Sequence, residues 1–172
     1  MSQEVILERI RARRVEHVLL TGGEPLLQRG TLPLIERLNQ EGYRVSIETH
    51  GEVSIEAASQ GARIIMDIKT PGSGMCRMGF KKNLPFLKPS DEIKFVITSR
   101  KDYDWAKAII LEGALPTNEI LLSPAVPAKG SPGTFEGVSA RDLADWILQD
   151  QLKVRFQLQL HKVLWGADTK GV

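Results

Sequence analysis

Residues 18–28 read VLLTGGEPLLQ, an apolar run that stops abruptly at a polar turn. The apolar residues at its start are typical of a buried β-strand. Thr21, two glycines and Glu24 follow, and Pro25 then precedes further apolar residues. In parallel α/β folds, binding groups gather where the strands end and the loops begin. The stretch therefore predicts a parallel strand that ends in a binding site.

The rest of the chain alternates between strand-like and helix-like segments. Short β-rich runs lie at residues 17–21, 44–49, 63–69, 92–98, 119–123 and 154–160. Apolar residues at helical spacing predict helices over residues 3–14, 32–41, 52–60 and 102–113, and after Ser139. Repeated strand–helix–strand units imply parallel strands joined by right-handed crossovers. We predict one α/β domain over residues 1–172, either barrel-like or an open doubly wound sheet.

Local signals predict where several helices begin and where two long loops lie. Ser2, Asp102 and Ser139 each precede an apolar helical face and are predicted helix caps. The segments 70–90 and 123–139 are rich in glycine and proline and poorly periodic. Loops of this length inside a compact domain are usually functional or mobile.

Composition excludes several classes of protein. The chain has 23 Lys and Arg, 21 Asp and Glu and a net charge of +2, without the concentrated basic face of a nucleic-acid binder. No apolar segment approaches the roughly 20 residues that span a bilayer, and the N-terminus lacks the apolar core of a signal peptide. The single cysteine, Cys76, excludes an intrachain disulfide. We expect a cytoplasmic protein without a membrane or nucleic-acid partner.

Polar clusters follow five of the predicted strands. They are TGGEP at 21–25, ETHG at 48–51, DIKTPGSG at 67–74, SPA at 123–125 and QLHK at 159–162. Two adjacent glycines can present backbone groups to a ligand with no Cβ in the way. The Glu24 carboxylate can receive an ammonium group, so the turn suits the amino-acid end of a zwitterionic cofactor. Taken alone, the motif also fits a tight turn whose glutamate is solvated.

The other candidates keep two interpretations each. His50 taken alone is typical of a surface or loop histidine. Asp67 and Lys69 alternate with an apolar residue, so they emerge on one face of their strand, either to pair with each other or to bind a ligand. His161 could likewise have a structural role or contact a ligand. No phosphate-binding P-loop, hydrolase nucleophile motif or clustered metal-ligand spacing is present in the sequence.

Taken together and in order, these motifs resemble the radical S-adenosylmethionine superfamily. The stretches VLLTGGEPLLQ, VSIETHG, IIMDIKTPGSGM and LQLHKVLWG narrow the resemblance to the 7-carboxy-7-deazaguanine synthase family, from about residue 15 to the C-terminus. The resemblance implies a partial (β/α) barrel. It also implies a lyase reaction in queuosine biosynthesis, in which a radical derived from S-adenosylmethionine converts 6-carboxytetrahydropterin to 7-carboxy-7-deazaguanine with the assistance of Mg²⁺.

The resemblance also implies roles for individual residues. Gly22, Gly23 and Glu24 would hold the methionine moiety of the cofactor, and Glu48 and Thr49 would line its pocket. The nucleoside part would contact Asp67, Ile68 and Lys69, with Ser123 and Pro124 near the adenine. At the substrate end the resemblance places Thr21, Gln159 and His161.

The chain departs from the family in its cysteines. The family carries a Cys-x3-Cys-x2-Cys motif before the Gly-Gly-Glu turn, whose thiolates hold a 4Fe–4S cluster, and a magnesium-contacting threonine beside it. Here Cys76 is the one cysteine, and it lies downstream. We therefore expect a barrel without its first strand–helix unit, no bound cluster or Mg²⁺, and no catalytic activity. The alternatives are a cluster-free S-adenosylmethionine- or pterin-binding regulatory domain, or a fragment of a glycyl-radical-enzyme activase.

The expected architecture has a consequence for assembly. A partial barrel that lacks one strand–helix unit exposes the edge of an apolar strand. Such an edge is a template for pairing with another chain. We therefore expect a homodimer.

Overall fold

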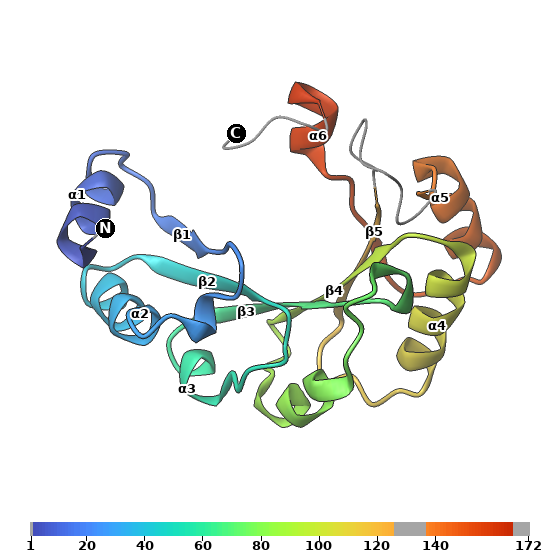
Figure 1. Cartoon of the computed structure of the whole chain (residues 1–172), viewed down its shortest axis with the longest axis horizontal. Helices are drawn as coiled ribbons and strands as arrows, with labels where there is room; N and C mark the ends of the chain where they lie inside the picture. Colours follow the sequence, from blue (N-terminus) through green and yellow to red (C-terminus); the bar gives the residue numbers. More distant parts are fainter. Residues whose placement is uncertain (1, 126–136, 167–172) are drawn as a thin grey trace.

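The computed structural model describes residues 2–125 and 137–166, which form one curved sheet of six parallel strands with most of the helices on its convex side (Figure 1). The strands are β1 (His17–Leu20), β2 (Arg44–Thr49), β3 (Arg63–Ile68), β4 (Glu92–Ile97), β5 (Glu119–Pro124) and β6 (Arg155–Phe156). The helices are α1 (Gln3–Arg11), α2 (Thr31–Gln40), α3 (Glu56–Ser59), α4 (Arg100–Leu111), α5 (Ala140–Gln149) and α6 (Leu160–Trp165). Three 3-10 segments complete the described elements: η1 (Pro25–Leu27), η2 (Pro71–Ser73) and η3 (Met78–Phe86).

The strand order decides between the two predicted architectures. All neighbouring strands pair in parallel and in chain order, β1-β2-β3-β4-β5-β6. A doubly wound sheet would reverse its order at a switch point, and this sheet does not. Its two ends stay apart, so the barrel is open (Figure 1). The expected partial (β/α) barrel is confirmed.

The two faces of the sheet differ in chemistry because successive side chains point to opposite faces. On the convex face, Ile47 and Ile64 lie side by side in register, and both are fully buried under the helices. On the concave face, Asp67 lies in register with Lys94, and charged residues recur along the strands. The apolar convex face forms the core, and the concave face is available for binding.

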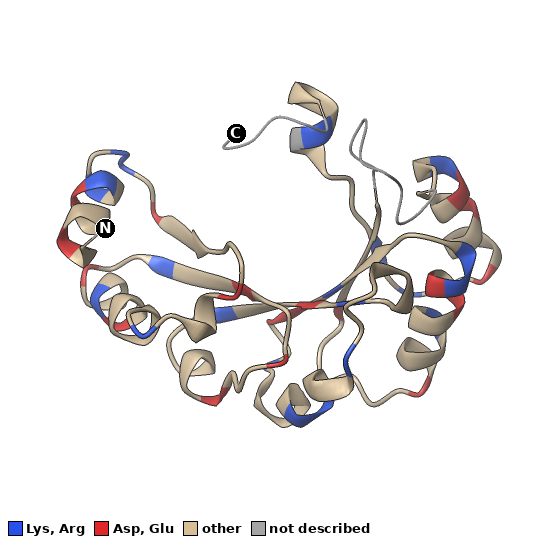
Figure 2. Cartoon of the chain, viewed as in Figure 1, with Lys and Arg blue, Asp and Glu red and all other residues tan. Residues whose placement is uncertain are grey.

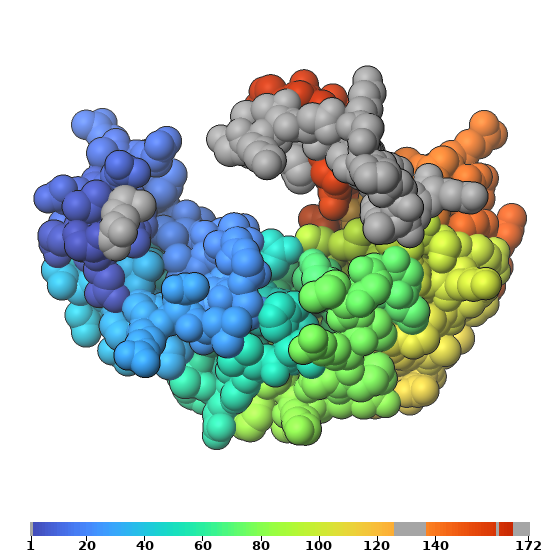
Figure 3. Space-filling model, viewed as in Figure 1, coloured from blue at the N-terminus to red at the C-terminus, as the bar shows by residue number. Residues whose placement is uncertain are grey.

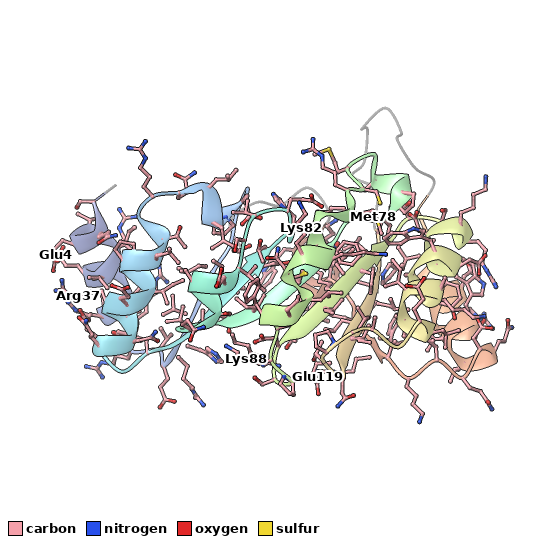
Figure 4. All side chains as sticks on the ribbon, turned by 90° about the horizontal axis from the view of Figure 1, so that it is seen from below. Glu4, Arg37, Met78, Lys82, Lys88 and Glu119 are labelled. Carbon is pink, nitrogen blue, oxygen red and sulfur yellow. The ribbon has the colours of Figure 1, made fainter. Side chains whose placement is uncertain are left out.

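Charge is spread over the whole molecule. Figure 2 shows basic and acidic residues interspersed on the helices. A cluster of this kind joins α1 to α2, where Arg37 contacts Glu4 and Glu41, and Figure 4 shows Glu4 and Arg37 close together. Within residues 2–125 and 137–166, no helix is long and apolar enough to cross a membrane.

Two of the predicted helix caps are confirmed and one is wrong. The Ser2 and Ser139 side chains accept backbone N–H bonds at the starts of α1 and α5. At α4 the cap is Ser99, whose hydroxyl accepts from the Asp102 N–H at 3.3 Å. The Asp102 side chain instead turns inward and is 1% exposed. Two of its partners, Thr70 and Gly72, lie about 30 residues earlier in the chain, so a rule for local capping could not predict them.

The segment 70–90 is built from 3-10 turns. Phe80 and Asn83 of η3 are buried, so this segment covers the convex side of β3 and β4 as a helix would. Figure 4 places Met78 on one side of the molecule and Lys88 on the other, toward opposite ends of the central strands. A three-residue period and the internal Pro85 explain why the sequence showed no helical pattern.

The predicted strand at 154–160 is largely wrong. Only Arg155–Phe156 pairs as β6, and α6 begins at Leu160, so the QLHK motif lies at the start of a helix. Apolar residues at alternate positions suggested a strand, but Phe156 and Leu158 are both partly exposed. The predicted helix at 52–60 shortens to Glu56–Ser59. Most of the predicted loop at 123–139 falls outside the described residues.

Candidate functional site

Three strand ends meet in one pocket on the concave side of the sheet. The pocket has a volume of about 200 Å³ and is lined by Thr21, Gly22, Gly23, Glu48, Thr49, His50, Asp67 and Lys69. They follow or end β1, β2 and β3, which are neighbours in the sheet. Figure 3 shows the molecule hollowed between its N-terminal residues in blue and α6 in red. The three clusters that the sequence predicted at these strand ends therefore come together.

The glycine turn after β1 has a backbone that requires glycine. Gly22 has φ +99° and Gly23 has φ +50°, a left-handed region that other residues adopt only with strain. A Cβ at either position would meet no atom within 4 Å, so the turn faces open space. The backbone groups of the turn are thus exposed to whatever fills the pocket.

Glu24 closes the turn and is almost completely buried. It caps η1, where its Oε1 accepts from the Leu26 N–H at 3.0 Å. Thr49 donates its hydroxyl proton to the same carboxylate, at 3.0 Å from Oε1 and 2.9 Å from Oε2. His50 reaches Oε2 twice, through its backbone N–H at 3.0 Å and its ring Nε2 at 3.2 Å. Glu24 therefore ties the end of β1 to the end of β2.

Glu48 forms a second link across the sheet. Its Oε1 accepts from Lys94 Nζ at 2.8 Å, and its Oε2 accepts from the Thr21 hydroxyl at 3.3 Å. Lys94, in the middle of β4, is a site residue that sequence reasoning missed. The available signal was a lysine inside the otherwise apolar run IKFVI of β4, since a strand covered by helices rarely carries an unpaired charge.

Asp67 carries an acceptor with no partner. Its Oδ2 accepts from Lys69 Nζ at 2.7 Å, while its Oδ1 is buried without a hydrogen bond. Buried carboxylate oxygens are normally satisfied, so Oδ1 indicates room for a ligand donor. Ile68, between Asp67 and Lys69 in the sequence, points to the convex side and is 1% exposed. Only its backbone could therefore contact a ligand.

The remaining predicted site residues lie away from this pocket. Ser123 and Pro124 end β5 and are buried, and the Ser123 hydroxyl has no hydrogen-bond partner. Gln159 precedes α6 with its side-chain oxygen buried and unpartnered, and His161 belongs to α6. Ser123, Pro124 and Gln159 are not among the residues that line the pocket formed by the first three strands.

The charge of the pocket suits a cation. Glu48 and Asp67 line the pocket and pair with the ammonium groups of Lys94 and Lys69, and the buried carboxylate of Glu24 lies beside them at the end of the glycine turn. With a neutral His50 the cluster keeps one net negative charge. S-adenosylmethionine, with an ammonium, a sulfonium and a carboxylate, has one net positive charge.

Comparison with known proteins shows the family. A 7-carboxy-7-deazaguanine synthase of Koribacter versatilis is 44% identical over 162 residues, which cover 90% of this chain and 71% of the relative. The chain belongs to the 7-carboxy-7-deazaguanine synthase family. Members from Chlorobaculum tepidum and Clostridium acetobutylicum are 37% and 36% identical over the whole chain, which covers 76% of each. No protein-family model matches the chain.

Solved structures support the radical S-adenosylmethionine fold of this 7-carboxy-7-deazaguanine synthase family member. QueE from Escherichia coli superposes with a TM-score of 0.60 at 20% identity over 91% of this chain. SuiB from Streptococcus suis, solved with S-adenosylmethionine bound, superposes with a TM-score of 0.65 at 15% identity over 96% of this chain. The chain spans 64% of the QueE chain and 45% of the SuiB chain.

The residues of this family member do not fit an iron–sulfur cluster. Three thiolates are needed, and the chain has one cysteine. Cys76 lies between η2 and η3, where burial, and then the charges of Asp102 and Glu52, raise the pKa of its thiol. Among the described residues, no three His, Cys, Asp or Glu side chains are grouped to hold a metal ion such as Mg²⁺.

Proposed function

We propose that this chain is the S-adenosylmethionine-binding part of a 7-carboxy-7-deazaguanine synthase. The observation that carries the proposal is the pocket at the ends of β1, β2 and β3. It combines a glycine turn with exposed backbone groups and a buried Asp67 oxygen that has no partner. The net negative charge of the pocket supports a cationic ligand.

The residues of the pocket divide into two groups around the proposed cofactor. Gly22 and Gly23, with Glu48 beside them, would face its methionine moiety. Asp67 Oδ1 would accept from a ribose hydroxyl, and Lys69 would stay paired at Oδ2 and orient the carboxylate. When bound in this family, S-adenosylmethionine supplies the deoxyadenosyl radical that starts the reaction.

The proposal extends to the residues farther from the pocket. Ser123 and Pro124 lie on the strand two places from β3, so an adenine ring would extend along the sheet toward them. The unpartnered Ser123 hydroxyl supports this direction. Gln159 and His161 stay assigned to the side of the 6-carboxytetrahydropterin substrate, together with Thr21. Because the chain carries one cysteine, we propose that it binds the cofactor without converting this substrate.

Replacing Asp67 with asparagine should weaken binding of S-adenosylmethionine about 10-fold to 100-fold. The neutral amide has one acceptor oxygen, which Lys69 would occupy, so the ligand loses its hydrogen bond to a charged group. Isothermal titration calorimetry of the whole chain measures the dissociation constant. Glu16→Gln is the matched control, because Glu16 is an exposed carboxylate at the other end of β1 that pairs with Arg44. Absence of a heat of binding with the unchanged chain would contradict the proposed function. An Asp67→Asn variant with the same dissociation constant as the unchanged chain would show that Asp67 does not contact the ligand.

One observation favours a second candidate function. The single cysteine is also what a cluster-free binding or regulatory domain would have. Both candidates bind S-adenosylmethionine, but only the first has an in-frame Cys-x3-Cys-x2-Cys motif upstream in its coding DNA. The relatives favour both candidates over an activase of glycyl-radical enzymes, because those reported above are all 7-carboxy-7-deazaguanine synthases.

We also propose that the chain forms a homodimer through β1. This strand is at the edge of the sheet, and Leu19 within it is 49% exposed. Light scattering at high concentration should give twice the mass of the chain. Leu19→Lys should shift the mass to that of a monomer, because a charge on an edge strand opposes pairing. A monomer before any substitution would contradict the proposal.

A further inference from the structure

The segment between β3 and β4 carries positive charge and no negative charge. Residues 70–90 contain no aspartate or glutamate, and they contain four cations: Arg77, Lys81, Lys82 and Lys88. Lys88 is used by the fold, because its Nζ donates to two backbone carbonyl oxygens near the end of α3, at 2.6 and 2.8 Å. The other three side chains are exposed and have no ion pair or hydrogen bond with any residue that the structure describes.

The absence of acidic neighbours distinguishes these three cations from other exposed ones. Arg13 and Arg14 at the end of α1 are also unpaired within the described part of the chain, but Glu8 and Glu16 lie close to them in the sequence. Like charges that lie close together on one element repel each other and lower stability. The fold shows no compensating contact for Arg77, Lys81 and Lys82, so a partner outside the chain is the natural counterpart of their charge.

The period of η3 turns its polar side chains away from the sheet. A 3-10 helix has three residues per turn, so residues three apart lie above one another. Phe80 and Asn83 share the ridge that packs on the sheet, and both are buried. Met78 and Lys81 share a second ridge, and Lys82 belongs to the third. The last three side chains therefore lie together on the outer side of η3.

Two exposed methionines lie among the cations. Met75 is 62% exposed and Met78 is 45% exposed. Methionine is flexible and polarizable, so it adapts to the surface of a partner. Methionine and arginine are also enriched in protein interfaces relative to the rest of the surface. We call these five residues together the η3 surface: Met75, Arg77, Met78, Lys81 and Lys82.

The η3 surface lies toward the ends of the strands, as the pocket does. Figure 4 places Met78 and Lys82 toward one side of the molecule, and Lys88 and Glu119 toward the other. Glu119 is the first residue of β5, so the strands begin on the side of Lys88 and end on the side of Met78. Asn83 of η3 also joins the loop after β2 through two hydrogen bonds of 2.8 Å. A partner on this surface would therefore lie beside the rim that holds the pocket.

The number and kind of side chains favour an acidic protein over other polyanions. A protein that binds duplex DNA contacts about six to ten phosphates, and binders of single strands stack the bases on exposed aromatic rings. The η3 surface has three cations, and Phe80, the aromatic residue beside them, is buried. Attachment to an anionic membrane takes clusters of about four to eight Lys or Arg. A protein face with a few carboxylates around an apolar centre matches three cations and two methionines.

We propose that the η3 surface docks an acidic protein. Carboxylates of the partner would lie opposite Arg77, Lys81 and Lys82, and an apolar side chain of the partner would contact the two methionines. This interaction does not depend on the ligand of the pocket, because the residues that line the pocket include none of the five that form the η3 surface.

The test uses a short peptide with glutamates on both sides of a central pair of leucines, and fluorescence anisotropy measures its dissociation constant. Binding should weaken as salt is added, because exposed charges are screened. Lys81→Glu with Lys82→Glu should raise the dissociation constant about tenfold, since two attractions become repulsions. Arg13→Glu with Arg14→Glu is the matched control, an adjacent and exposed pair on another element. Equal losses in the two double variants would show that binding follows net charge alone and would overturn the proposal.

A third double variant tests the apolar part of the surface. Met75→Ser with Met78→Ser should weaken binding of the leucine peptide about threefold to tenfold, because its leucines lose apolar contact. Binding of a peptide with serines in place of the leucines should not change. Equal binding of the leucine peptide before and after this substitution would show that the methionines are not part of the surface.

Other partners and damage to the fold are distinguished by separate measurements. A single-stranded oligonucleotide or vesicles containing phosphatidylserine that bind more tightly than the peptide, and lose binding in the Lys81 and Lys82 variant, would overturn the assignment to a protein. The variants should melt at the temperature of the unchanged chain, since they alter exposed side chains only. A chain that binds the peptide but not S-adenosylmethionine would contradict the proposed function and support the η3 surface.

Discussion

Replacing Asp102 with alanine should lower the free energy of unfolding by about 3–5 kcal/mol, the range for removing a buried charged partner. Its carboxylate accepts from the Gly72 N–H at 2.8 Å, the Thr70 hydroxyl at 3.0 Å and the Thr98 N–H at 3.2 Å. The Thr98 hydroxyl is a fourth donor. Alanine leaves all four donors without a partner in a region that water does not reach. Urea denaturation followed by circular dichroism measures the change.

The matched control lies on the same helix. Asp104 forms an exposed pair with Arg100, and Asp104→Ala should change the free energy of unfolding by less than about 0.5 kcal/mol. For a chain of this length, the loss at Asp102 corresponds to a fall in melting temperature of about 6–20 °C. Equal stabilities for the two variants would contradict the role assigned to Asp102. The same substitution should also loosen the turn at Gly72, where an added Cβ would collide with Thr98 and Asp102.

Replacing Asn83 with alanine should cost about 2–4 kcal/mol, because three buried backbone groups lose their partners. Asn83 is 3% exposed and joins η3 to the loop after β2 through both atoms of its amide. The loop carries His50, so affinity for S-adenosylmethionine should fall together with stability. Denaturation and calorimetry on the same sample measure the two effects.

Asn39 provides the comparison for Asn83. It also donates its side-chain amide to a backbone carbonyl, that of Gly61, at 2.8 Å, but Asn39 is exposed. Asn39→Ala should cost less than about 1 kcal/mol and leave cofactor binding unchanged. An Asn83 variant as stable as the Asn39 variant would show that water replaces the lost bonds.

Sequence patterns predicted the parts of the fold that depend on neighbouring residues. The strands at 44–49, 63–69 and 92–98 were found within one residue because short β-rich runs of alternating or adjacent apolar residues lie between turns. The pocket followed from the same reasoning, since the ends of parallel strands must meet at one edge. The same patterns failed at 154–160, where alternating apolar residues belong to an exposed stretch that bends into α6.

Residues that act across strands were not predictable in this way. The position of Asp102 near a helix start satisfied the local rule for a cap, while two of its partners, Thr70 and Gly72, come from the loop after β3. His50 required knowledge of Glu24 on another strand and of the Glu52 backbone. Lys94 sits in the middle of a strand, far from any turn that would mark it. In each case the missing information was a contact between distant parts of the chain.

The sequential order of the strands links binding to the local opening of the sheet. Each strand contacts only its neighbours in the chain, so β1 can separate without breaking the pairs among β3, β4 and β5. The pocket takes one wall from β1 and another from β3. A ligand that fills it contacts both the edge strand and the centre of the sheet. The free energy of binding therefore adds to the free energy needed to separate β1 from the sheet. Occupancy of the pocket would thus be reported by the exchange of amide hydrogens in β1 with solvent.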